Sequence, residues 1–289
     1  KLCDKVDHPR FRVRVAWLPH LAMLNWQNKD FTASDMATLA ILLPWMPCLE
    51  ELLLGHSFGD GCMPSLFERL ERGVAPSLTK LYIQNNNIGP AGAEALAAAL
   101  RRGAMPKLMR LTLANNPTLG NQGAAALGAV LRKRSVFERL DLGVCGIGDE
   151  GVASLVDNLG KDDFKALEHL HLDGNTIGDV GCAKLVAALS TGALPAIEAL
   201  HDRYKDGISE HASEEACVAV KSALRKRLDA KQAAAALAAA RAADARARKA
   251  AEAAEVEARL REQRAAAAVA AEAEARAAAR AEEAAAAAA

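Results

Sequence analysis

The sequence predicts an α/β solenoid of parallel strands and helices, followed by one long α-helix. Two observations support this prediction. A pattern of about thirty residues recurs between Pro19 and Pro195, and its successive starts lie 28 to 30 residues apart. Beyond Gly207 the chain contains neither Gly nor Pro, and from about Leu224 its composition narrows mostly to Ala, Arg, Lys and Glu. The first pattern is typical of stacked repeats and the second of a continuous helix.

Each repeat combines a short strand with a helix. In the unit "PSLTKLYIQNNNIGPAGAEALAAAL", Leu81 and Ile83 lie two residues apart and therefore face one side of a strand. Leu96 and Leu100 lie four residues apart and share one face of a helix. One strand and one helix cannot bury these leucines alone, so the units must stack with parallel strands inside and helices outside.

Between strand and helix, four units carry Ile or Leu followed by Gly-x-x-Gly. In the unit above these glycines are Gly89 and Gly92. Glycine tolerates positive φ and close approach of another backbone, so the motif predicts a tight turn into the helix.

The repeats resemble the leucine-rich repeat family, in its ribonuclease-inhibitor-like subclass with a full helix in each unit. The resemblance covers residues 19–224 and implies a concave face of strands and a convex face of helices. It also implies a buried ladder of asparagines that satisfies backbone groups at each bend. The ladder positions are Asn86, Asn116 and Asn175, with Cys145 as a variant and with Lys29 and Ser57 in the first two units, where the ladder is expected to be weaker.

Three segments follow from these patterns. Residues 1–18 are expected to form an N-terminal cap, because "FRVRVAW" (residues 11–17) alternates apolar and basic residues. Residues 19–224 form the solenoid of about seven units. Residues 225–289 belong to an Ala-rich charged helix whose start is indicated by Ser213 before Glu214 and Glu215.

The helix is expected to run for roughly 65–75 residues, about 100 Å at 1.5 Å per residue. Pairs such as Glu255 and Arg259 favour it by their i, i+4 spacing. Large apolar residues are sparser than a coiled coil requires. Whether it is a lone helix or pairs with another helix is left open.

The composition gives no sign of a nucleic-acid-binding, membrane-spanning or disulfide-rich protein. The formal net charge is +0, which gives no general bias toward nucleic acid or membrane. No apolar run is long enough to span a bilayer. The six cysteines lie far apart without a C-x-x-C pair, which favours reduced thiols and an intracellular, cytoplasmic protein.

The residues between the core leucines are expected to form rows across the concave face, because equivalent positions of neighbouring strands lie side by side. One row contains Lys80, Arg110 and Arg139, a basic stripe suited to an acidic segment of a partner protein. Tyr82 in the next row would be an aromatic anchor. The alternative is that Glu138, Glu168 and Glu198, each one residue upstream of a row position, neutralise much of the stripe.

A second group on this face contains His169, His171, Asp173, Asp141 and His201. These five side chains raise the alternative of a zinc-like site. Side chains of parallel strands splay outward, however, whereas tetrahedral coordination requires them to converge. A pH-sensitive partner-binding surface is therefore preferred, and no metal or cofactor is predicted.

The long helix carries a second candidate surface. Residues 221–249 contain nine basic and two acidic residues, and this excess suggests contact with an acidic surface. The candidate residues are Arg225, Lys226, Arg227, Arg241, Arg246 and Arg248. The alternative is an ordinary solvated charged helix. No aromatic residue lies in this segment, so it offers no stacking platform for single-stranded nucleic acid.

No catalytic signature is present: the sequence contains no P-loop, G-x-S-x-G or H-E-x-x-H. The expected function is therefore a non-enzymatic protein-interaction scaffold. The long helix favours a structural subunit of a large ciliary, cytoskeletal or organellar assembly, and the Ala-rich composition favours the axoneme. The resemblance extends to the GTPase activators of the Ran system, which makes a GTPase regulator an alternative, although none of their functional residues can be placed here.

Overall fold

The computed structural model describes residues 15–200 and 211–287. Residues 11–14 of the expected capping segment (residues 11–17) lie outside these ranges, as does His201. The rest of that segment, Val15 to Trp17, was expected to be a strand but lies in a 3₁₀ helix. The chain divides into two compact units, residues 1–228 and 229–289, and each is considered by itself.

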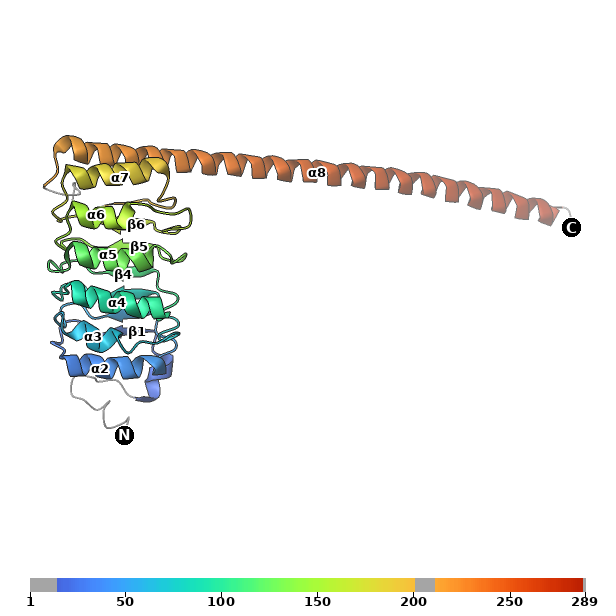
Figure 1. Cartoon of the computed structure of the whole chain (residues 1–289). Helices are drawn as coiled ribbons and strands as arrows, with labels where there is room; N and C mark the ends of the chain where they lie inside the picture. The colour runs from blue at the N-terminus through green and yellow to red at the C-terminus, as the bar shows by residue number, and fades with distance from the viewer. Residues whose placement is uncertain (1–14, 201–210, 288–289) are drawn as a thin grey trace. The chain divides into compact units, whose positions relative to one another are not determined.

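The first unit contains a parallel sheet of six strands in the order of the sequence (Figure 1). The strands are β1 (Met23–Asn25), β2 (Glu51–Leu53), β3 (Lys80–Tyr82), β4 (Arg110–Thr112), β5 (Arg139–Asp141) and β6 (His169–His171). A seventh repeat contributes one isolated bridge, between His169 and Ala199.

Helices connect the strands and stack on one another, α2 through α7, on one side of the sheet (Figure 1). They are α2 (Ala33–Leu42), α3 (Cys62–Phe67), α4 (Pro90–Arg102), α5 (Gly120–Leu131), α6 (Asp149–Val156) and α7 (Asp179–Thr191). Two 3₁₀ helices are also present: η1 (Val15–His20) precedes β1, and η2 (Leu43–Trp45) follows α2. The order of parallel strands and helices confirms the predicted α/β solenoid.

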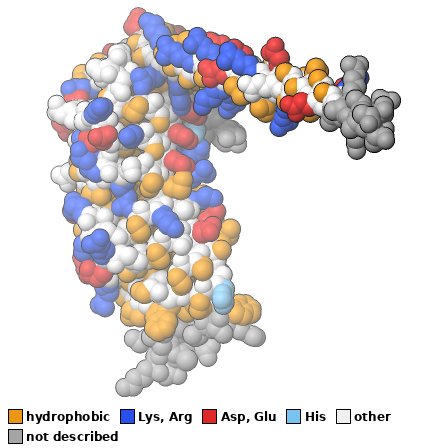
Figure 2. Space-filling view, turned by 90° about the vertical axis from the view of Figure 1, so that its right-hand side faces the viewer, with side chains coloured by type: hydrophobic (Ala, Val, Ile, Leu, Met, Phe, Trp, Pro, Cys, Tyr) orange, Lys and Arg blue, Asp and Glu red, His pale blue; other side chains and the backbone are white. Residues whose placement is uncertain are grey.

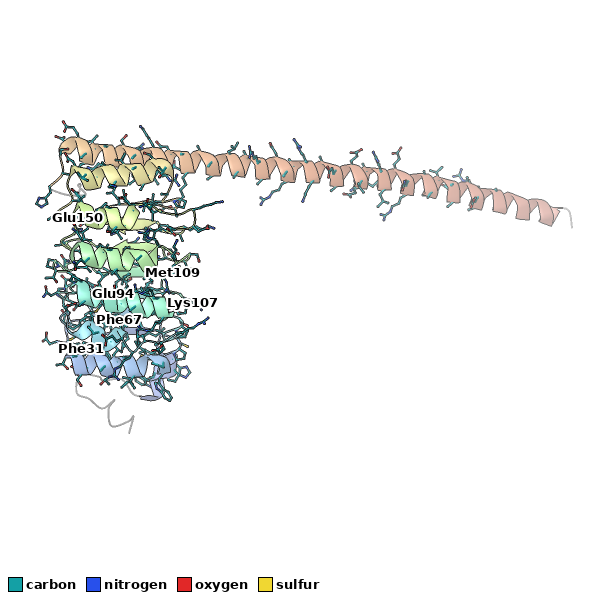
Figure 3. The ribbon with its side chains drawn as sticks, in the orientation of Figure 1. Phe31, Phe67, Glu94, Lys107, Met109 and Glu150 are labelled. Atoms are coloured by element: carbon teal, nitrogen blue, oxygen red, sulfur yellow. The ribbon has the colours of Figure 1, made fainter. Side chains whose placement is uncertain are left out.

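The core lies between the sheet and the helices. The middle residue of every strand is a leucine, and each is at most 3% exposed: Leu24, Leu52, Leu81, Leu111, Leu140 and Leu170. Leu96 and Leu100 of α4 meet this column from the helical side and are also buried. Phe67 at the end of α3 is buried as well, whereas Glu94 on α4 and Glu150 on α6 are exposed (Figure 3).

The asparagine ladder is present in the buried bends after the strands. The Oδ1 atom of Asn116 accepts hydrogen bonds from the backbone N–H groups of Asn86 and Ile88, at 3.0 and 2.9 Å. Its Nδ2 atom donates to the carbonyl oxygens of Ile83 and Leu113. One amide thus satisfies four backbone groups in two repeats, in a place from which water is excluded.

Two smaller side chains occupy ladder positions elsewhere. The thiol of Cys145 donates to the carbonyl oxygens of Leu113 and Gly143, and burial raises the pKa of this thiol to about 12, so it stays protonated. The hydroxyl of Ser57 donates to the carbonyl oxygens of Trp26 and Gly55. Lys29 is exposed. The ladder is therefore continuous from Ser57 onward and absent at Lys29.

A second set of contacts links the starts of several helices to the repeat before them. Asp149, the first residue of α6, accepts hydrogen bonds from the N–H groups of Gly178 and Gly181 at the start of α7, at 2.7 and 2.9 Å. Asp60 accepts equivalent bonds from the Gly-x-x-Gly before and within α4, and Asn121 accepts one from Gly148. Carboxylate and amide oxygens at this place satisfy the free N–H groups of a helix start and favour its dipole.

These contacts explain the Gly-x-x-Gly motif. The expectation of positive φ at Gly89 and Gly92 is wrong, because Gly89 has a φ of −102° and Gly92 lies inside α4. The close approach is the real reason. A Cβ atom on Gly151 would lie 2.6 Å from the Oδ1 atom of Asn121, and one on Gly181 would lie 2.6 Å from that of Asp149. A side chain at these glycines would displace the capping oxygen.

Pro90 interrupts this second ladder. It occupies the position of Asp60 and Asp149 but has no side-chain acceptor. The next helix, α5, accordingly begins without a side-chain cap, after a turn in which Gly120 has a φ of +63°. The N–H group of Gly120 donates instead to the carbonyl oxygen of Cys145 in the following repeat.

Replacing Asp149 with alanine is expected to lower the free energy of unfolding by about 1–2 kcal/mol, because the start of α7 loses its acceptor. Asp149→Asn should recover most of the loss, since Asn121 plays the same role one repeat earlier. Urea denaturation followed by circular dichroism measures both values. The matched control is Glu150→Ala, which removes an exposed carboxylate from the same turn. An equal loss in that control would contradict the capping role.

The last helix, α8 (Glu214–Ala287), begins as part of the solenoid unit. Asp179 accepts a hydrogen bond from the N–H group of Ser213 at 2.7 Å, which extends the second ladder to the start of α8. Val220 is 1% exposed, and Leu224 packs against the same core. The first three turns of α8 therefore close the hydrophobic core of residues 1–228.

From Asp229 onward α8 belongs to the second unit and is exposed wherever its side chains are described. The helix as a whole runs for 74 residues, consistent with the predicted length. The expected i, i+4 ion pairs Glu255–Arg259, Glu257–Arg261 and Glu272–Arg276 are formed at 2.6–2.7 Å. Within the ranges that the structure describes, no helix is both long and apolar enough to cross a membrane.

Candidate functional site

The first and third residues of strands β1–β6 point away from the core leucines and form a surface that we call the strand face. The strand pairing places the predicted residues in register. Lys80, Arg110, Arg139 and His169 are consecutive partners on β3 to β6. Adjacent strands lie about 4.8 Å apart, so these four side chains form one row.

Neutralisation by acidic residues decreases along this row. Lys80 forms an ion pair with Glu51. Arg110 lies 3.8 Å from a carboxylate oxygen of Glu138, which is too long for a hydrogen bond. No ion pair connects Arg139 with another described residue, and its buried Nε atom has no hydrogen-bond partner among them. Neutralisation by acidic residues therefore describes the Lys80 end of the row. At the other end, Arg139 keeps a hydrogen-bond donor that a partner protein could use.

The neighbouring row contains Tyr82, Thr112, Asp141 and His171, also in register. His171 is nearly buried, and its Nδ1 atom lies 3.9 Å from a carboxylate oxygen of Asp141. The rings of His171 and His169 meet edge to face with centroids 6.0 Å apart. Tyr82 is half-buried at the other end of the row.

Asp173 follows β6 and is 7% exposed. Its carboxylate lies beside Gly143, where a Cβ atom would be 3.3 Å from both carboxylate oxygens and 3.4 Å from one oxygen of Asp141. Glycine at this position thus leaves room for two acidic side chains of neighbouring repeats. Because Asp173 is buried in this way, it contributes less to the surface than the sequence suggested.

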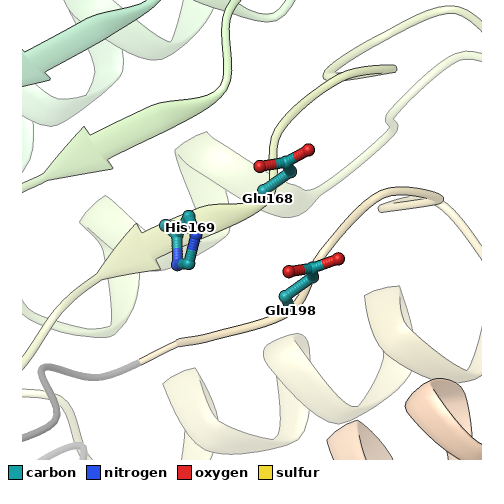
Figure 4. Close-up of side chains that lie close together, drawn as sticks. All are labelled: Glu168, His169 and Glu198. Carbon is teal, nitrogen blue, oxygen red and sulfur yellow. The ribbon is translucent and has the colours of Figure 1, made fainter.

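His169 has a different set of neighbours from the one expected. Its imidazole nitrogen and carboxylate oxygens of Glu168 and Glu198 lie within 4.8 Å of one another (Figure 4). Burial lowers the pKa of His169, and the positive charge of Arg139 lowers it further. The zinc alternative considered for His169, His171, Asp173 and Asp141 is not supported by such a convergence, and His201 lies outside the described residues.

The basic residues of the tail lie on α8. Arg225 and Lys226 are exposed, and the guanidinium group of Arg227 lies against Gly192 at the end of α7. Arg241, Arg246 and Arg248 are exposed in the second unit. Figure 2 shows Lys and Arg side chains gathered along the first part of α8, in agreement with the charge of residues 221–249.

Sequence reasoning missed two features of this region. Glu168 and Glu198 were treated only as neutralising charges, although the structure brings them to His169. The acidic or amide residue after the first glycine of each Gly-x-x-Gly, as in Asp149, was not recognised as a cap. Its recurrence in four of five aligned units was a usable signal.

The fold and the repeated unit define the class of protein. The family model described as Leucine Rich repeat matches residues 74–97, 135–156 and 166–186, which are parts of three of the repeats described above. These three segments are therefore similar to leucine-rich repeats, and they lie within a solenoid of strand-and-helix units that is followed by one long helix.

Particular proteins resemble parts of this chain. The Tonsoku-like protein of Bos taurus is 37% identical over 131 residues, which cover 44% of this chain but only 9% of that protein. Among solved structures, the Caenorhabditis elegans tropomodulin C-terminal domain is 13% identical with a TM-score of 0.34, covering 75% of this chain and 93% of that one. Leiomodin-1 Actin-Binding Site 2 is 15% identical with a TM-score of 0.36, covering 82% and 97%.

Proposed function

We propose that this protein is a non-enzymatic interaction scaffold and a structural subunit of a large intracellular assembly. Its strand face binds an acidic segment of a partner protein, and α8 provides a second, elongated surface. The leucine-rich repeats and the similarity to part of the Tonsoku-like protein support a scaffold of this kind.

One observation carries the proposal for the strand face. Lys80, Arg110 and Arg139 are partners on adjacent strands, and acidic side chains of the protein neutralise only part of their positive charge. Arginine forms paired hydrogen bonds with carboxylates, and a buried guanidinium donor without a partner is costly. A carboxylate from a partner would satisfy Arg139 and compete with the long contact between Arg110 and Glu138. Tyr82 adds an aromatic surface at the edge of the row.

The composition of α8 supports the second surface. Its exposed large apolar residues in the second unit are few, Leu237, Val256, Leu260 and Val269, and its basic residues are concentrated in residues 221–249. The two halves of the helix therefore differ in charge. A contact with an acidic surface would use the first half, and the i, i+4 ion pairs would support the second half as a helix in water.

The strand face is tested with a fluorescent twelve-residue peptide rich in Glu and Asp, titrated with the full chain and followed by anisotropy. The double variant Arg110→Glu, Arg139→Glu is expected to weaken binding at least tenfold, because two attractive contacts become repulsive. Added salt should weaken the wild-type complex. A chain that ends at Leu228 should bind as the full chain does, because the row lies in the first unit.

The matched control is Arg101→Glu, Lys107→Glu. It makes the same change in net charge but at exposed residues outside the strands. If this control weakens binding as much as the strand-face variant, the peptide responds only to net charge and the proposed surface is wrong. Unchanged binding by the strand-face variant leads to the same conclusion.

A further inference from the structure

Two acidic side chains and one imidazole meet at the end of the sheet. Glu168 directly precedes β6, His169 is the first residue of β6, and Glu198 lies in the seventh repeat. Their donor atoms all lie within 4.8 Å of one another, and Figure 4 shows the two carboxylates on neighbouring segments of the backbone with the imidazole to the left of them.

The backbone holds these residues in place. The N–H group of Glu198 donates to the carbonyl oxygen of Glu168 at 2.7 Å, and Ala199 pairs with His169 as an isolated bridge. Glu168 and Glu198 are therefore lateral neighbours. Two negative charges that lie side by side on neighbouring strands repel each other.

We propose that Glu168, His169 and Glu198 bind one divalent transition-metal ion of the Zn²⁺ class. An imidazole nitrogen and two carboxylate oxygens are a ligand set that zinc accepts, and three protein ligands leave a fourth position for water or a partner group. The ion would also remove the repulsion between the two carboxylates. This site is independent of the proposed binding of an acidic peptide.

The side chains can close around an ion with small movements. Zinc bonds to nitrogen and oxygen are about 2.1 Å long, so two ligands of one tetrahedral ion lie about 3.4 Å apart. Glu198 is exposed and Glu168 half-buried, so changes in their side-chain torsions can supply the remaining ~1.4 Å without moving the backbone.

Arg139 lies beside this ligand set and opposes the ion, since it is in register with His169 on β5. Glu198 lies on the other side of β6, away from β5. Weaker binding than at a structural zinc site is expected from this balance.

The test is isothermal titration of the full chain with Zn²⁺ at pH 7. Every sample carries Cys48→Ser, because the exposed thiol of Cys48 could bind zinc itself. One equivalent of zinc should bind. Glu168→Gln, His169→Ala and Glu198→Gln are each expected to weaken binding at least tenfold, with circular dichroism confirming an unchanged fold.

Two variants serve as matched controls. Glu138→Gln removes the equivalent carboxylate one strand away, and His171→Ala removes the neighbouring imidazole. Both should bind zinc as the parent chain does. The proposal is overturned if the parent chain takes up no stoichiometric zinc, or if the three ligand variants bind it as tightly as the two controls.

Discussion

Replacing Asn116 with alanine is expected to lower the free energy of unfolding of the solenoid by about 4 kcal/mol. The side chain makes four hydrogen bonds in the interior, two accepted and two donated. Each such bond contributes about 1 kcal/mol, and its loss leaves a buried backbone group without a partner. Since single domains are stable by only about 5–15 kcal/mol, the variant should be close to unfolding at 37 °C. Urea denaturation and thermal melts measure the effect.

Two further variants separate the ladder from general effects of side-chain size. Asn116→Cys should be less damaging than Asn116→Ala, because Cys145 donates from the equivalent position one repeat later. Gln122→Ala removes an exposed amide from the neighbouring helix α5 and should change stability by less than about 0.5 kcal/mol. If Asn116→Ala were as mild as Gln122→Ala, the ladder would not be a main source of stability.

Replacing Val220 with aspartate is expected to cost roughly 3 kcal/mol or more. Val220 is 1% exposed and belongs to the core of the first unit, so the variant buries a carboxyl group among leucines and removes an apolar contact. The physical reason is that the first turns of α8 cover the last repeat of the solenoid. A urea-induced unfolding curve followed by the fluorescence of the tryptophans reports on this unit, which contains all three.

Val218 provides the matched control, since it lies two residues away on the same helix and is 55% exposed. Val218→Asp introduces the same charge with the same effect on helix propensity. It should therefore change the unfolding midpoint little. Equal destabilisation by both variants would mean that the helix itself, and not the buried contact, responds to the substitution.

The solenoid was predictable because the same pattern of buried leucines recurs in every repeat. Leucines at L-x-x-L-x-L positions determine both the buried column and the register, and the observed pairing of Lys80 with Arg110 and Arg139 follows from aligning them. The start of α8 was predictable from Ser213 and two glutamates. Its role as the cover of the core was not, because Val220 looks like any apolar residue of a helix.

The candidate site was only partly predictable. Which residues share a row depends on backbone register, and the sequence contains that information. Which groups a side chain contacts depends on its rotamer and on the free space around it. Two examples are the space beside Gly143, which admits Asp173, and the approach of Glu198 to His169. For this reason the structure brings His169 together with Glu168 and Glu198, whereas the zinc alternative grouped it with His171, Asp173 and Asp141.

The caps formed by Asp60, Asn121, Asp149 and Asp179 have a consequence for how such a protein can change by duplication or exchange of whole repeats. Four repeats carry the acceptor that the next helix uses, so these repeats are interchangeable as predecessors. The repeat with Pro90 lacks this acceptor. Its successor α5 starts through Gly120 instead. Recombination that moves these two repeats together keeps the contact between them. Recombination that separates them is expected to lower the stability of the solenoid.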